Sequence, residues 1–173
     1  GDPFNQILNN KTLNNLKSLR FFKTVSSEVK EGSTDGQKII NIFVEEKPTG
    51  EITASAGVGT SGTSFGAGVR ENNFLGRGIT LNSNFTISED TIRGLFSVKN
   101  PNFLDTDKSV YTSIESLETD KLKAYGYKTS RTGFSLGTSF EYYDDTRFGL
   151  GTSNFYEKIE TDSTASARQK KQE

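Results

Sequence analysis

The amino-acid sequence predicts a mainly β protein, a partial antiparallel transmembrane β-barrel meander of about seven strands preceded by a truncated α+β unit. Three observations predict this fold. Apolar residues alternate with polar or small ones from residue 51 onward, which is the period of a strand with two different faces. The chain contains 17 Gly and 13 Phe but only 3 Pro, which suits strands interrupted by glycine. Mean hydropathy is −0.60, too low for a membrane helix of about 18 apolar residues, whereas barrel strands need only about 10 residues each.

The first 47 residues predict a helix followed by two strands. Asp2-Pro3 offers a helix cap with Pro at the first helical position, and leucine and isoleucine then recur at helical spacing, so we expect a helix at about Asn5 to Leu19. Short strands are expected at Thr24–Val29 and Ile39–Val44, with a turn at Glu31–Gly36 between them. This unit is too small to bury a core, so we expect that elements upstream of Gly1 complete it.

Residues 48 to 160 predict the meander. Pro48-Thr49-Gly50 separates it from the first unit, and turns such as Thr60-Ser61-Gly62 join its strands. The seven expected strands are Ile52–Val58, Phe65–Arg70, Ile79–Ile87, Ile92–Lys99, Ser109–Leu117, Phe134–Tyr142 and Arg147–Phe155. Residues 161 to 173 are a polar tail, expected to be disordered or part of a loop.

The two faces of the predicted strands differ as they do in a membrane barrel. Charged side chains share a face with Gly, Ser, Thr and Asn, as in a water-filled lumen. The apolar face carries no charge in mid-strand, which a membrane barrel requires and a soluble core would require too. These charged residues are Arg70, Arg93, Lys99 and Glu141. Four aromatic residues near one edge suggest an interfacial girdle, although they could be ordinary turn and core aromatics: they are Phe74, Phe103, Tyr142 and Tyr143. The polar stretch Glu118–Ser130 at the opposite edge is expected to be an extracellular loop.

Composition excludes much catalytic chemistry. The chain has no Cys and no His, which removes disulfides, thiolate catalysis, imidazole bases and ordinary zinc sites. Its 21 Lys and Arg against 22 Asp and Glu give no basic field for nucleic acid. The string Gly57–Gly62 matches G-x-G-x-x-G, but a strand rather than a helix is expected after it, so a dinucleotide site is disfavoured. The adjacent carboxylates of Asp144-Asp145 are expected to be solubilising. We therefore expect no enzyme activity, cofactor or metal.

Four motifs, taken in order, resemble the BamA-like family of outer-membrane protein assembly factors, which carry POTRA domains ahead of a transmembrane barrel. Residues 1–25 are similar to the last helix and following strand of a POTRA domain. The run Glu45–Gly50 resembles the junction with the barrel, and Glu71–Gly78 resembles the turn after the second barrel strand. Asn100–Phe103 resembles the turn after the fourth. The resemblance implies that residues 1–47 are the C-terminal part of a POTRA domain. We expect both chain ends to be cuts, because the chain contains no Met and its polar end stops without a closing element.

The resemblance also implies a function and partners. It implies a protein of the bacterial outer membrane, with its N-terminal part in the periplasm, that folds unfolded outer-membrane protein clients into the bilayer without ATP, aided by periplasmic accessory lipoproteins. In the family the first barrel strand forms a weak seam with the last. The candidate seam strand here is Ile52, Thr53, Ala54, Ser55, Ala56, Gly57 and Val58, and the family-like periplasmic turn is Asn73, Phe74, Leu75, Gly76, Arg77 and Gly78.

Physical reasoning leaves alternatives open. A short strand of Ala, Gly, Ser and Thr has little side-chain area to fasten it to a neighbour, so its edge could accept a client strand. The same small residues could instead merely fit a crowded barrel wall. The whole protein could also be a related POTRA-barrel translocator or secretion transporter that exports its client. A soluble or passive β protein is a third reading, which the helix and strands ahead of the meander disfavour.

Overall fold

The computed structural model describes residues 3–34, 36–59, 62–143 and 146–171, which form two units, Gly1–Thr49 and Gly50–Glu173. Some sequence-based expectations fall partly outside the described residues. These are the cap at Asp2, the position of Asp35 in the first hairpin turn, the turn residues Thr60 and Ser61, and the Asp144-Asp145 pair.

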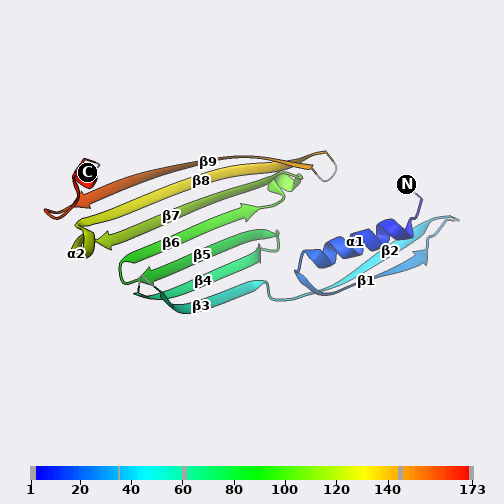
Figure 1. Cartoon of the computed structure of the whole chain (residues 1–173). Helices are drawn as coiled ribbons and strands as arrows, with labels where there is room; N and C mark the ends of the chain where they lie inside the picture. The colour runs from blue at the N-terminus through cyan, green and yellow to red at the C-terminus, as the bar shows by residue number, and fades with distance from the viewer. Residues whose placement is uncertain (1–2, 35, 60–61, 144–145, 172–173) are drawn as a thin grey trace. The chain divides into compact units, whose positions relative to one another are not determined.

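The first unit contains one helix and one hairpin (Figure 1): α1 (Gln6–Ser18), β1 (Phe22–Glu31) and β2 (Lys38–Glu46). The predicted helix is confirmed, but Asn5 caps it instead of Asp2-Pro3, because the Asn5 Oδ1 accepts the N–H groups of Ile7 (2.8 Å) and Leu8 (3.3 Å). β1 and β2 pair antiparallel. The helix lies against β1, where the Asn9 Nδ2 donates to the Ser27 Oγ at 3.1 Å.

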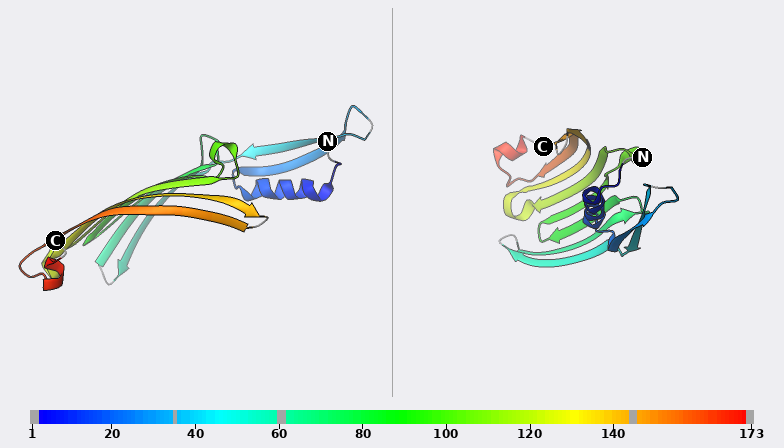
Figure 2. Two further views of the ribbon diagram at one scale, coloured as in Figure 1. Left: turned by 90° about the horizontal axis from the view of Figure 1, so that it is seen from above. Right: turned by 90° about the vertical axis from the view of Figure 1, so that its right-hand side faces the viewer.

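The second unit is one antiparallel sheet of seven strands in sequence order, which confirms the predicted meander. Its strands are β3 (Gly50–Gly59), β4 (Gly62–Phe74), β5 (Ile79–Ser88), β6 (Thr91–Asn100), β7 (Ser109–Lys121), β8 (Tyr127–Tyr143) and β9 (Thr146–Thr161). Short helical turns are η1 (Phe103–Asp105), α2 (Leu122–Tyr125) and α3 (Ala167–Lys170). The sheet is twisted and curved (Figure 2), and β3 and β9 form its two ends without pairing with each other.

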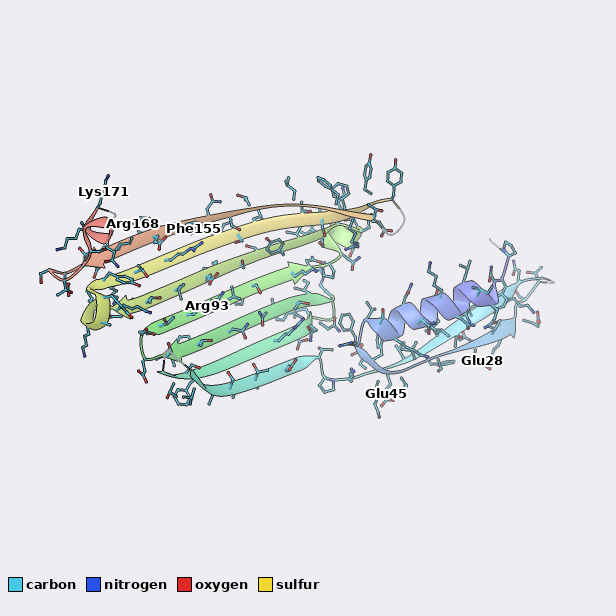
Figure 3. All side chains as sticks on the ribbon, viewed as in Figure 1. Glu28, Glu45, Arg93, Phe155, Arg168 and Lys171 are labelled. Atoms are coloured by element: carbon cyan, nitrogen blue, oxygen red, sulfur yellow. The ribbon has the colours of Figure 1, made fainter. Side chains whose placement is uncertain are left out.

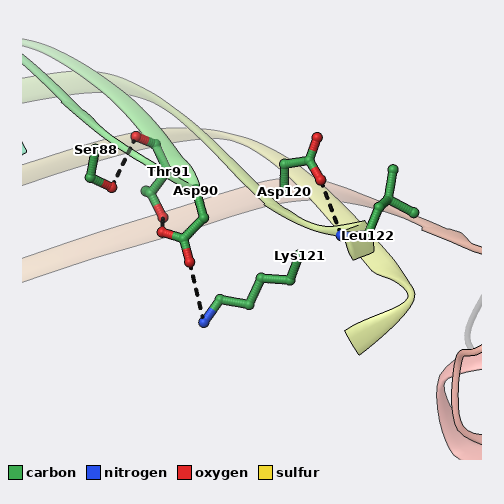
Figure 4. Close-up of polar contacts among 6 residues, drawn as sticks. All are labelled: Ser88, Asp90, Thr91, Asp120, Lys121 and Leu122. Atoms are coloured by element: carbon green, nitrogen blue, oxygen red, sulfur yellow. Dashed lines mark hydrogen bonds and ion pairs between the residues drawn. The ribbon is translucent and has the colours of Figure 1, made fainter. Parts of the chain in front are cut away.

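The expected loop at Glu118–Ser130 is wrong. β7 continues to Lys121, α2 makes one turn, and β8 begins at Tyr127, which pairs with Lys121. A polar sequence can still form a strand, because backbone hydrogen bonds between neighbouring strands hold it in place. An ion pair adds to them here, since the Lys128 Nζ lies 2.8 Å from the Glu118 Oε1. The neighbouring hairpin turn is tied to the end of β7 (Figure 4), because the Lys121 Nζ lies 3.6 Å from the Asp90 Oδ2.

The expected loop or disordered tail contains structure. The Asp162 N–H donates to the carbonyl of Gly126 at 2.8 Å, which fastens the tail to the turn after α2. The Asp162 Oδ1 accepts the N–H (2.7 Å) and hydroxyl (2.6 Å) of Thr164. Ala165 is buried beside this contact. Beyond it, Ser166 caps α3 with its side chain.

A pH dependence follows from this contact. The hydrogen bonds from Thr164 hold the pKa of the Asp162 carboxyl below its ordinary value of 3.8. A lowered pKa in the folded state means that the contact stabilises the tail above the unfolded pKa and that this contribution is lost as the pH falls through the folded pKa. We expect the carboxyl carbon resonance of Asp162 to titrate with a midpoint below 3.8, and Thr164→Ala to move that midpoint upward. An unchanged midpoint in the variant would contradict the contact.

Candidate functional site

The strand register sorts the side chains of the sheet onto two chemically different faces. Directly paired residues share a face, so rows of partners can be followed across the sheet. The apolar face carries Ile52, Phe65, Val69, Phe85, Ile87, Phe96, Val98, Ile114, Phe134, Leu136, Phe148 and Leu150. The polar face carries Thr53, Ser55, Gly66, Gly68, Arg70, Asn82, Asn84, Arg93, Lys99, Glu115, Arg131, Gly137, Glu141 and Gly151.

The apolar face has no cover within the described chain. Phe65, Phe85, Phe96 and Phe134 stay 57%, 49%, 48% and 46% exposed, and among the described residues Ala165 is the only buried hydrophobic side chain. A continuous exposed apolar surface of this kind marks a contact with another protein or with a membrane. The sheet is therefore one layer whose apolar side needs an apolar partner.

Close contacts between side chains on the polar face show that the sheet curves toward that face. A Cβ added to Gly66 would lie 2.6 Å from the Ser55 Oγ, and one added to Gly68 would lie 2.7 Å from the Thr53 Oγ1. A Cβ added to Gly94, which lies on the apolar face, would meet nothing within 4 Å. Because side chains converge on the concave side of a curved sheet, the polar face is the inner one, and its glycines make room there.

Two arginines of the polar face are paired or stacked, and Figure 3 labels one of them, Arg93, and the ring that the other contacts, Phe155. The Arg93 Nε lies 2.8 Å from the Glu115 Oε1 across β6 and β7, and the Arg131 guanidinium carbon lies 3.7 Å from the centre of the Phe155 ring. Arg93 and Glu115 are both about half exposed, so their ion pair contributes little stability. These groups suit a wet interior better than a dry core.

The predicted seam residues all lie in β3, at one end of the sheet. β3 pairs with β4 along its whole length, from Gly50↔Glu71 to Gly59↔Gly62, and has no partner on its other side among the described residues. Every residue of β3 is exposed, Ile52 at 84% and Val58 at 86%. The strand is thus attached by its backbone ladder and by small side chains leaning over the glycines of β4.

The predicted turn residues lie together at the edge of the sheet where β3 begins. The N–H of Gly76 donates to the carbonyl of Asn73 at 2.9 Å, and the N–H of Arg77 donates to that of Phe74 at 3.3 Å. The Asn73 Oδ1 accepts the N–H of Gly78 at 2.7 Å, which closes the turn. Leu75 and Gly76 both have positive φ.

Two β-bulges at this same edge were not predicted from the sequence. The register of β4 and β5 shifts by one residue between Glu71 and Phe74, so that Phe74 pairs with Ile79 and joins the apolar face. The register of β8 and β9 shifts likewise before Tyr143, which pairs with Thr146. A bulge changes the face of the sheet on which the following side chain lies, here that of Phe74 and that of Tyr143. In the sequence, the bulges are signalled only by two adjacent pairs of like residues, Asn72-Asn73 and Tyr142-Tyr143. Simple alternation would place the two residues of each pair on opposite faces, although they are chemically alike.

No catalytic or metal centre is apparent in the part of the chain that the structure describes. It contains no group of three or more carboxylate, His or Cys residues that could hold a metal ion. Its helices are all too short or too polar to cross a membrane. The G-x-G-x-x-G string runs from β3 into β4, and the strand beginning at Gly62 leaves no helix terminus for a pyrophosphate.

Comparison with known proteins agrees with this geometry. The family model described as the Omp85 superfamily domain matches residues 73–173. Among solved structures, the chain is similar to the crystal structure of BamA from Haemophilus ducreyi lacking POTRA domains 1–3, with a TM-score of 0.75 and 26% sequence identity. The match covers 88% of this chain and 30% of that one, so the chain spans less than a third of the BamA structure.

Proposed function

The chain belongs to the Omp85 superfamily, and from this premise we propose that its parent protein assembles and inserts β-barrel proteins into the bacterial outer membrane. The observation that carries the proposal is a curved sheet that is apolar outside and polar inside, and whose first strand has only small side chains, Thr53, Ser55 and Gly57, on its inner face. The likeness to BamA supports the outer-membrane setting.

We propose that residues 48–160 are the first strands of a transmembrane barrel. The exposed phenylalanines of the apolar face would then lie against hydrocarbon, and the Arg93–Glu115 pair would lie in the lumen. A Lys or Arg facing lipid at mid-membrane costs about 2–4 kcal/mol. The mid-strand charges Arg93 and Glu115 lie on the polar face, whereas Glu118 and Lys128 of the apolar face lie near strand ends. Residues 1–47, by the same proposal, are the C-terminal part of a POTRA domain in the periplasm.

The free edge of β3 is the proposed site of client pairing. A strand edge with unsatisfied N–H and C=O groups templates another strand, and pairing through the backbone tolerates many client sequences. The segment Ile52–Val58 is short and has small side chains on its inner face, so pairing along it gains little from side chains and stays reversible. Clients would be unfolded outer-membrane proteins, with periplasmic accessory lipoproteins as further partners, and no ATP or other cofactor is required by this scheme.

Depleting the full-length protein in its host tests the proposal. Resident barrel proteins are expected to disappear from the outer membrane while their unfolded forms accumulate in the periplasm. Were resident barrels to be inserted normally while one exported protein failed to reach the surface, the protein would be a translocator and the assembly function would be lost.

A further inference from the structure

The sequence Asn-Phe-Leu occurs twice, at residues 73–75 and 102–104, and each copy forms a turn at the edge of the sheet where β3 begins. The first copy joins β4 to β5 and the second joins β6 to β7. The two copies are separate in the sequence and share no pairing with each other. The same short sequence therefore forms a turn independently at two places in the sheet.

The backbone of the two turns is the same. In the first, the N–H groups of Gly76 and Arg77 donate to the carbonyls of Asn73 and Phe74. In the second, the N–H groups at positions 105 and 106 donate to the carbonyls at positions 102 and 103, each at 3.2 Å. The Asn side chain also closes each turn, through the Asn73 Oδ1 in one and the Asn102 Nδ2 in the other.

Both leucines hold a conformation that leucine disfavours. φ is 58° at Leu75 and 54° at Leu104, and the following residues, Gly76 and Asp105, also have positive φ, as in a type I′ turn. Gly suits such positions because it has no Cβ to clash with the backbone, and Asn tolerates them because its short polar side chain can hydrogen-bond locally. The side chains gain no packing in return, since Leu75 is 77% and Leu104 is 75% exposed. Two strained and exposed leucines in matching turns point to a contact outside the chain.

The neighbouring residues indicate what that contact is. The bulges turn Phe74 and Tyr143 onto the apolar face at this edge, and Phe140 and Phe148 on that face have ring centres 5.7 Å apart. The apolar surface thus continues to the turns that present the leucines. Aromatic residues with an apolar body suit the boundary between lipid head groups and acyl chains, and leucine side chains insert just below it.

We propose that Leu75 and Leu104 insert into the lipid leaflet at this edge and anchor the barrel rim there. The inference rests on the proposed membrane barrel but not on client assembly. The partner is the lipid surface itself. An unfolded client polypeptide bound at the same tips is the competing outcome that the experiment must separate.

Single tryptophans test the inference, because this chain contains none. Leu75→Trp and Leu104→Trp are placed one at a time in the full-length protein, with any tryptophan outside this chain removed, and the protein is folded into phospholipid vesicles with and without brominated acyl chains. We expect blue-shifted emission and strong quenching by brominated lipid at both positions. Thr34→Trp, in the exposed hairpin turn between β1 and β2, is the aqueous control and should not be quenched.

A third tryptophan position distinguishes loss of the leucine anchor from loss of the membrane barrel. Phe134→Trp lies at the middle of the apolar face and should be quenched if the sheet is in the membrane. Quenching at Phe134→Trp without quenching at either leucine position overturns the anchor and leaves the barrel intact, and so does a blue shift that depends on adding an unfolded client. Absence of quenching at all three positions overturns both the barrel and the anchor.

A double variant gives a second readout. Leu75→Asn with Leu104→Asn places a residue that tolerates positive φ in both turns, so the backbone is relieved while the apolar tips are removed. We expect the urea midpoint in detergent to stay the same or rise and folding into vesicles to slow several-fold. A loss of stability in detergent would instead assign the leucines a purely structural role.

Discussion

Replacing Ala54 or Ser55 by proline, one at a time, is expected to separate the two sides of β3. Successive N–H groups of a strand point to opposite sides, so one of these positions donates toward β4 and the other toward the free edge. Proline removes the donor and is tolerated on an edge strand only where its missing N–H faces outward. We expect the outward variant to keep a folded barrel in the membrane but to lower client insertion about tenfold, which corresponds to about 1.4 kcal/mol, the order of one backbone hydrogen bond.

The measurement is the amount of folded client and of folded parent barrel, scored separately by heat-modifiable gel mobility. Ala54→Ser and Ser55→Ala are matched controls, because both keep the backbone N–H, and they should insert clients normally. The inward proline variant should lower the amount of folded parent barrel itself. Normal client insertion with both proline variants would refute the role of β3 as a template.

Replacing Gly137 by alanine is expected to destabilise the sheet by about 1–3 kcal/mol, the usual cost of overpacking. Tyr111 on β7, Gly137 on β8 and Gly151 on β9 form one cross-strand row on the polar face. The Tyr111 ring lies over Gly137, so that an added Cβ would stand 2.8 Å from its Cδ1 and 3.0 Å from its Cζ, while the hydroxyl oxygen would stand 3.5 Å from a Cβ at Gly151. The ring fills the place that a side chain at Gly137 would need.

Two comparisons make this prediction specific. Gly149→Ala is the matched control on the same face and the next strand, because its Cβ would meet the Ser139 Cβ at an ordinary 3.6 Å, and its effect should be small. In a Tyr111→Ala background, Gly137→Ala should cost little, since the overlapping ring is gone. The urea midpoint of the folded barrel in detergent gives both values. Equal costs at Gly137 and Gly149 would contradict the role assigned to Tyr111.

The sequence predicted the strands better than their ends. Alternation located most of the seven strands, because each strand in mid-sheet needs two different faces, although it was weak in the fifth, Ser109–Leu117. It failed near Glu118 and beyond Phe155, where both faces are polar and only the backbone ladder holds the strand. The two bulges escaped prediction for a different reason. A shift of one residue in register changes which face an aromatic occupies, and the sequence marks it only by the adjacent pairs Asn72-Asn73 and Tyr142-Tyr143.

The candidate site was predictable in part. Family resemblance identified Ile52–Val58 and Asn73–Gly78, and the structure places the first at a sheet end and the second in a closed turn. The repeated Asn-Phe-Leu could have indicated that the two turns are alike. It could not predict the positive φ of Leu75 and Leu104, because that conformation depends on the length of the turn between the paired strands. The fit of Tyr111 over Gly137 gave no sequence signal, because it joins residues 26 positions apart through register alone.

The most direct test of a sheet with lipid on one face and water on the other is a cysteine scan along residues 133 to 138 of β8 in the full-length protein in outer-membrane vesicles, since this chain contains no native Cys. A sheet between lipid and water predicts that a water-soluble thiol reagent labels cysteines at Gly133 and Ser135 and leaves those at Phe134, Leu136 and Thr138 unlabelled until the membrane is dissolved. Gly137 is left out of the scan because the Tyr111 ring lies over it. Labelling without this alternation, or on the phenylalanine and leucine side first, would contradict a sheet with lipid on one face and water on the other.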